Sequence, residues 1–184
     1  ADALLKCADM AVSVVKREQR NSLRSFSDDL RTMADLRLAL ETEMRKALEQ
    51  GEFELFYQPV VEYPHGEILA AEALIRWHHP KRGLLSPGEF IPLAEECGLI
   101  VEIGEWGLKT ACAQMAYWIR NGLAPHAVAV NLSGISFRHV RLLAAVRNAL
   151  AGSGLPPERL ELEMTESVLM NDVELTNEIL AELK

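Results

Sequence analysis

Three residues on three predicted strands are of types that bind hard cations. They are Glu72, Asn131 and Glu163, each placed within or at the end of an apolar segment. If the strands are parallel, their carboxyl ends meet at one edge of the sheet, and such groups converge there. Two carboxylates and an amide oxygen suit Mg²⁺ or Mn²⁺ better than zinc. The residue types therefore indicate a candidate metal site.

Each of these residues also has a plain structural interpretation. Asn131 could hydrogen-bond to backbone at the end of its strand. Alternation places Glu161 and Glu163 on one face, as a solvated edge strand would. Spacing alone leaves both interpretations open.

Glu72 and Arg76 share one face of the predicted strand Ile68–Trp77, because side chains alternate along a strand. A buried carboxylate without a partner costs several kcal/mol, so Glu72 needs a cation, a proton or donors. The two residues could form a plain ion pair, or they could be a metal ligand and a phosphate clamp. His78 and His79 follow directly, and we expect both to be loop residues.

The composition limits the classes of partner. The 184 residues suit one domain with an appendage, and the net charge of −8 argues against nucleic acid or an acidic membrane surface as partner. Without an apolar run of about 18–20 residues or a signal-peptide pattern, we expect a cytoplasmic protein. Its three cysteines, Cys7, Cys97 and Cys112, are predicted to be reduced, buried thiols.

The order of elements predicts an α/β fold. A connection of six residues, Glu62–Glu67, is too short for a parallel crossover, so the first two strands should be antiparallel. From the second strand onward, strands and helices alternate, which predicts parallel βαβ units. The predicted strands are Phe53–Val61, Ile68–Trp77, Ala127–Leu132 and Leu160–Thr165. The predicted helices are Asp2–Arg20, Asp29–Gln50, a short one from Pro87 to Gly98, Glu105–Arg120 and Val140–Ala151. A last helix is predicted after its cap Asp172, with Leu175, Ile179 and Leu183 on its inner face. Asn21–Asp29 is predicted to be a linker.

Several motifs resemble the EAL domain, the bacterial cyclic-di-GMP phosphodiesterase family, from about Leu36 to the last residue. The matching motifs are Phe56-Tyr57-Gln58-Pro59, Glu72-Ala73-Leu74 with Ile75-Arg76-Trp77, Phe90-Ile91-Pro92-Leu93-Ala94-Glu95-Glu96, Val130-Asn131-Leu132-Ser133 and Glu161-Leu162-Glu163-Met164-Thr165-Glu166-Ser167. In addition, residues 1–28 resemble the final helix of a GGDEF domain and a linker, although Ser13–Val15 departs from that pattern. We therefore expect an EAL-like domain over residues 29–184.

The resemblance implies a modified TIM barrel with an antiparallel first strand, of which four strands would form an open half. It implies metal ligands at Glu72, Asn131 and Glu163, dinucleotide contacts at Gln58 and Arg76, and a catalytic loop anchor at Glu166, with Glu72 also catalytic. The cofactor would be Mg²⁺ or Mn²⁺ in a two-metal site. The family's Asp-Asp pair and later Lys cannot be located, because the sequence stops at Lys184.

Three functions follow from the resemblance. The parent protein could hydrolyse cyclic-di-GMP to the linear dinucleotide, bind it as a degenerate receptor, or serve as a regulatory or homodimerisation module. Glu72, Asn131, Glu163 and Glu166 are all intact, which favours the hydrolase for the parent protein. We expect the 184-residue chain alone to be inactive.

Overall fold

The computed structural model describes residues 28–123, 125–164 and 173–183. The chain divides into two compact units, residues 1–45 and 46–184. Helix α2 (Asp28–Gln50) has residues in both units, and it agrees with the predicted helix Asp29–Gln50. The predicted helix Asp2–Arg20 and most of its linker lie outside the described residues. No helix in the described ranges is both long enough and apolar enough to span a membrane.

Unit 46–184 is built on an open mixed sheet in the order β1-β2-β4-β5, with β3 paired to β2. β1 and β2 are antiparallel, as the short connection predicted, whereas β2–β4 and β4–β5 are parallel. Pro59 lies on β1, at one edge of the sheet, where a missing backbone donor is tolerated. The strands are β1 (Phe53–Val61), β2 (Ile68–His79), β3 (Gly83–Leu85), β4 (Ala127–Asn131) and β5 (Leu160–Glu163).

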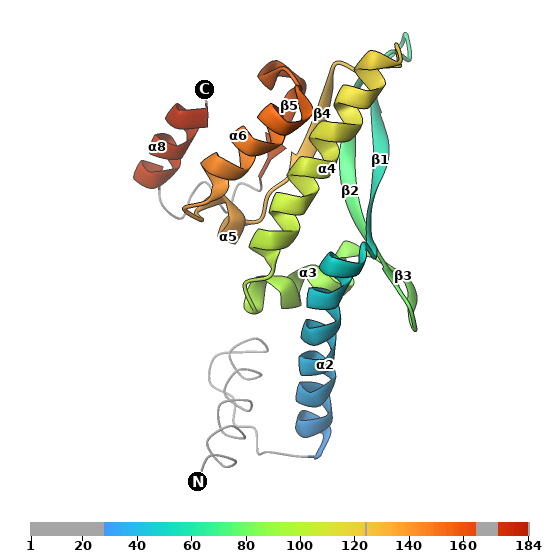
Figure 1. Ribbon diagram of the computed structural model, residues 1–184, viewed down its shortest axis with the longest axis vertical. Helices are drawn as coiled ribbons and strands as arrows, with labels where there is room; N and C mark the ends of the chain where they lie inside the picture. Colours follow the sequence, from blue (N-terminus) through green and yellow to red (C-terminus); the bar gives the residue numbers. More distant parts are fainter. Residues whose placement is uncertain (1–27, 124, 165–172, 184) are drawn as a thin grey trace. The chain divides into compact units, whose positions relative to one another are not determined.

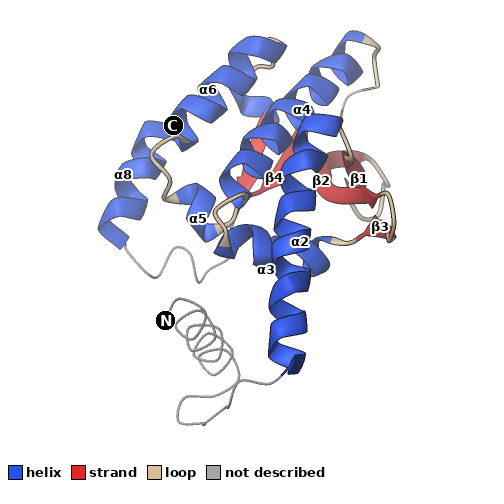
Figure 2. Cartoon of the chain, turned by 60° about the horizontal axis from the view of Figure 1, so that its bottom comes forward, coloured by secondary structure: helices blue, strands red, loops and turns tan. Residues whose placement is uncertain are grey.

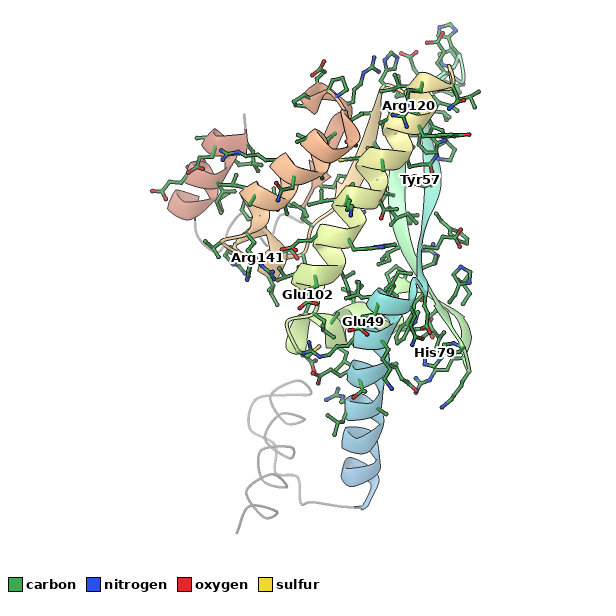
Figure 3. The ribbon with its side chains drawn as sticks, viewed as in Figure 1. Glu49, Tyr57, His79, Glu102, Arg120 and Arg141 are labelled. Atoms are coloured by element: carbon green, nitrogen blue, oxygen red, sulfur yellow. The ribbon has the colours of Figure 1, made fainter. Side chains whose placement is uncertain are left out.

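The assignment of His78 and His79 to a loop is wrong, because β2 continues through both residues and pairs with β3, a strand that was not predicted. Gly83 begins β3 with φ +76°, a conformation that glycine adopts without steric cost. His79 is buried, its ring lies 4.8 Å from that of Trp77, and its Nδ1 accepts a hydrogen bond from Lys81 N at 3.1 Å. Figure 3 labels His79 where β2 leads into β3.

Helix α3 (Pro87–Glu96) begins at the predicted capping box. The Glu89 carboxylate accepts hydrogen bonds from Ser86 N at 2.8 Å and from Ser86 Oγ at 2.9 Å. These two bonds, backbone first, lower the pKa of Glu89. The helix start is therefore stabilised by a charge-assisted local contact.

The remaining helices differ from the predictions mainly at their ends. α4 (Ile100–Arg120) begins five residues before the predicted Glu105. α6 (Leu142–Ser153) continues past the predicted end at Ala151 and is capped by Gly154, which has φ +70°. A positive φ is typical of a glycine that caps the C-terminus of a helix, as Gly154 does for α6. Two short elements, α5 (Gly134–Phe137) and the 3-10 turn Pro157–Arg159, span too few residues to show a period. α8 (Val173–Leu183) agrees with the predicted last helix, whose predicted cap, Asp172, lies outside the described residues.

The helices of this unit cover one face of the sheet. α4 and α6 lie side by side over β4, with α8 beyond α6 (Figures 1 and 2). The core between these layers is formed by alternate strand residues and by one side of each helix. It includes Ala73, Val128, Val130, Leu108, Cys112, Met115 and Val146, with Ile179 and Leu183 of α8 packed against it as predicted.

The two cysteines that the structure describes, Cys97 and Cys112, are both free thiols. Cys112 is buried, which raises its pKa to about 11, whereas Cys97 is half-buried. Cys7 lies outside the described residues.

Candidate functional site

The candidate site lies on the face of the sheet opposite the helical layer. Because side chains alternate, Tyr57, Ala73 and Val130 point to the core and their neighbours point to the other face. Tyr57, labelled in Figure 3, contacts Trp118 of α4 with ring centroids 4.8 Å apart, and its burial raises its pKa to about 12. The residues between these core positions are therefore available for chemistry.

The strand register brings four of the predicted site residues together. Gln58 of β1 lies opposite Glu72 of β2, Glu72 lies opposite Ala129 of β4, and Asn131 lies opposite Glu163 of β5. Asn131 and Glu163 are each the last residue of their strand. Four adjacent strands thus contribute one polar side chain each to a single face.

A direct hydrogen bond joins two of the predicted ligands. Asn131 Nδ2 donates to Glu72 Oε1 at 2.7 Å, although the residues are 59 positions apart in the sequence. This contact differs from the backbone bond that could have explained Asn131. Donation through Nδ2 leaves Asn131 Oδ1 and the second Glu72 oxygen as acceptors for an ion.

Glu163 is electrostatically linked to the same cluster. Desolvation raises the pKa of Glu163, and the nearby charges of Glu72 and Glu161 raise it further. Repulsion between neighbouring carboxylates is relieved by a proton or by a bound cation. The neighbouring carboxylates of Glu72 and Glu163 therefore provide an electrostatic environment that suits a divalent ion.

The donor chemistry of the cluster also fits a hard divalent metal. Two carboxylates and one amide oxygen match the ligands that Mg²⁺ and Mn²⁺ take in proteins. Across the described ranges no group of three His, Cys, Asp or Glu side chains could hold an ion, and this cluster combines two carboxylates with the amide of Asn131.

Arg76 lies on the same face as Glu72, four residues further along β2, and is half-buried. The described residues show no ion pair between them, so the plain ion-pair interpretation is not what the structure contains. Arg76 Nη1 instead donates to Ile75 O at 2.8 Å, and its Cζ lies 5.5 Å from the centroid of the Phe56 ring. Its guanidinium is thus held on an aromatic face and has donors to spare for an anion.

Two features of this surface were not predicted from the sequence. One is the stacking of Arg76 on Phe56, and the other is an ion pair between His78 and Glu54. Strand alternation could have placed all four residues on one face, but the choice of partners depends on side-chain conformations. Glu166, predicted to anchor a catalytic loop, lies outside the described residues.

An open α/β sheet with helices on one face and an acidic cluster on the other defines the class of domain, a partial TIM-barrel-like fold. The model of the EAL domain family matches residues 41–184. The chain therefore belongs to the EAL domain family.

Two relatives from Pseudomonas aeruginosa have functional names. The chain is 45% identical over 176 residues to "Bifunctional diguanylate cyclase/cyclic di-GMP phosphodiesterase MucR", covering 96% of this chain and 26% of that protein. It is 38% identical over 183 residues to "Cyclic di-GMP phosphodiesterase NbdA", covering 100% of this chain and 23% of that protein. The chain thus spans about a quarter of the length of these curated relatives.

Two solved structures share the fold and are bound to the same dinucleotide. The structure described as "PaMucR Phosphodiesterase, c-di-GMP complex" is 48% identical, with a TM-score of 0.76 over 79% of this chain and 59% of that one. The Xanthomonas citri FimX EAL domain in complex with c-diGMP is 27% identical, with a TM-score of 0.74 over 83% of this chain and 59% of that one. Both matches confirm the predicted family and fold class.

Proposed function

We propose that the protein carrying this sequence hydrolyses cyclic-di-GMP to the linear dinucleotide in the presence of Mg²⁺ or Mn²⁺. The observation that carries the proposal is the 2.7 Å contact between Glu72 and Asn131 on neighbouring strands. The raised pKa of Glu163 beside Glu72 supports the same site. The names of the relatives support the substrate, because MucR and NbdA are both called cyclic di-GMP phosphodiesterases.

The proposed roles follow from the placement of each residue. Glu72, Asn131 and Glu163 hold the ion through oxygen atoms. Arg76, stacked on Phe56, binds a phosphate of the dinucleotide, to which its guanidinium presents two parallel donors. Gln58, opposite Glu72, contacts the substrate from β1. A divalent ion bound in this cluster supplies Lewis acidity and lowers the pKa of a bound water.

The proposed domain organisation places an EAL domain over residues 29–184 and the end of a GGDEF-like domain with its linker over residues 1–28. The family match beginning at residue 41 supports the first assignment. The second rests on the sequence resemblance, and the name of MucR, which describes a bifunctional cyclase and phosphodiesterase, fits it.

The test is conversion of cyclic-di-GMP to the linear dinucleotide by the full-length protein, with Mg²⁺, with Mn²⁺ and with a chelator. Replacing Glu72 by Gln should lower kcat by roughly 100-fold or more, because ligation to a catalytic ion contributes several kcal/mol to transition-state stabilisation. Glu67→Gln, an exposed acid in the β1–β2 loop, is the matched control and should retain wild-type activity. Turnover unaffected by Glu72→Gln would contradict the metal assignment, and binding without turnover in the wild type would identify a receptor.

A further inference from the structure

Arg76 faces a carboxylate that it does not bind. In the antiparallel pairing of β1 with β2, Glu54 is the residue directly opposite Arg76. Opposite charges at such positions ordinarily attract one another, since their Cβ atoms are about 4.5–5.5 Å apart. The expected contact between these two residues is nevertheless absent from the ion pairs of the described chain.

Both residues take a diagonal neighbour instead. The Glu54 carboxylate pairs with His78 Nε2, two positions beyond Arg76 on β2. The Arg76 guanidinium turns the other way, over the ring of Phe56 at 5.5 Å. The side chains of His78 and Glu54 are 52% and 56% exposed, so packing does not prevent Glu54 from moving to Arg76.

We propose that His78 is a positioning residue that holds Glu54 away from Arg76 and so leaves the guanidinium available for a phosphate of the dinucleotide. The inference rests on the proposed function of this site. It assigns roles to His78 and Glu54, neither of which touches the substrate in the proposal.

The physical basis is competition for one cation. If His78 is removed, Glu54 loses its partner, and the cationic side chain directly opposite it on β2 is Arg76. A phosphate must then displace a carboxylate before it can bind Arg76. Exposed cross-strand pairs of this kind are weak, so the expected loss of affinity is about two- to five-fold.

The first experiment measures binding of cyclic-di-GMP to the full-length protein by calorimetry, with Ca²⁺ in place of the catalytic ion to limit turnover. His78→Ala should weaken binding about two- to five-fold, and Glu54→Gln alone should not weaken it. The double variant should return to wild-type affinity, because the competing charge is then gone. A double variant as weak as His78→Ala would overturn the proposal, since it would indicate a direct or merely structural role for His78. His65→Ala, an exposed histidine in the β1–β2 loop, is the matched control and should bind as the wild type does.

The second experiment separates failure of this inference from failure of the proposed function. The Nε–Hε resonance of Arg76, assigned by its loss in Arg76→Ala, reports its partner without any substrate. It should shift in His78→Ala and return in the double variant with Glu54→Gln. If the wild type does not bind cyclic-di-GMP, the proposed function fails, yet this resonance still decides whether His78 controls the pairing of Arg76. An unshifted resonance in His78→Ala would overturn the inference.

Discussion

At the scale of single residues, the candidate site is a cluster of acceptor groups in which two carboxylates, Glu72 and Glu163, lie near each other. Glu72 receives one amide donor from Asn131, while the pKa of Glu163 is raised by desolvation and by the charge of Glu72. Glu89 is the opposite case, because donors from Ser86 stabilise its charged form. The same side-chain type thus occupies a proposed ligand position in one environment and a helix cap in the other.

The Glu89 cap gives a prediction about pH. Its folded-state pKa is lowered below the ordinary 4.5, so its contribution to stability is present above the unfolded pKa and is lost as the pH falls through the folded value. Glu89→Gln should therefore lower Tm at pH 7, and the difference from wild type should shrink as the pH falls to 4 and below. The measurement is thermal unfolding by circular dichroism across this range. Glu67→Gln is the control, because Glu67 does not cap a helix. A decrease in Tm of Glu89→Gln that is the same at every pH would contradict the role of the charge.

At the scale of elements, the sheet itself separates the candidate site from the core, because α4 packs on the face of the strands opposite the site. A cavity of about 340 Å³ lies between α3, α4 and the sheet, and it reaches Asn131 at the end of β4. Gly104 and Gly107 line it from α4, where larger side chains would have filled the space. Packing behind the site is therefore incomplete at this point.

Gly107→Ala is expected to stabilise the protein. A Cβ at Gly107 would meet no atom within 4 Å, and alanine is favoured over glycine inside a helix by about 0.5–1 kcal/mol. Urea unfolding should show this gain in the free energy of unfolding. Gly104→Ala is the comparison variant, because it has the same helical preference and its Cβ would make an ordinary van der Waals contact with Ser136 Oγ at 3.4 Å. A loss of stability in Gly107→Ala would contradict the open space at that position.

At the scale of the whole molecule, the sheet is open, with β1 at one end of the strand order and β5 at the other. The chain covers 59% of the solved MucR phosphodiesterase chain. Its described residues bring together two carboxylates and one amide, a donor set that would suit one hydrated divalent ion. A second ion would need further carboxylates.

Hydrolysis should therefore require more of the protein than these 184 residues. The full-length protein should convert cyclic-di-GMP to the linear dinucleotide with Mg²⁺ or Mn²⁺, whereas the 184-residue chain should bind it weakly and leave it uncleaved. An open site also exposes the phosphate contacts to water, which weakens each of them. The assay compares both proteins at equal concentration, after circular dichroism has shown that the shorter chain is folded. Turnover by the shorter chain would refute the requirement.

Local signals in the sequence determined much of the fold. The six-residue connection Glu62–Glu67 was too short for a crossover and so required antiparallel β1 and β2, as observed. Ser86 and Glu89 marked the start of α3 because both partners of that cap lie within one helical turn. Polar residues within or at the end of apolar segments identified Glu72, Asn131 and Glu163 as candidates. Each of these inferences depends on residues close together in the chain or on a periodic pattern.

Only the tertiary structure decided which side chains pair across strands. The sequence placed Glu72 beside Arg76 on one face, yet Glu72 accepts from Asn131, and Arg76 stacks on Phe56. His78 and His79 were misjudged because strand β3, three residues long, is defined by its pairing with β2 and has no period of its own. These choices depend on distances between residues far apart in the chain, and local propensity carries no information about such distances.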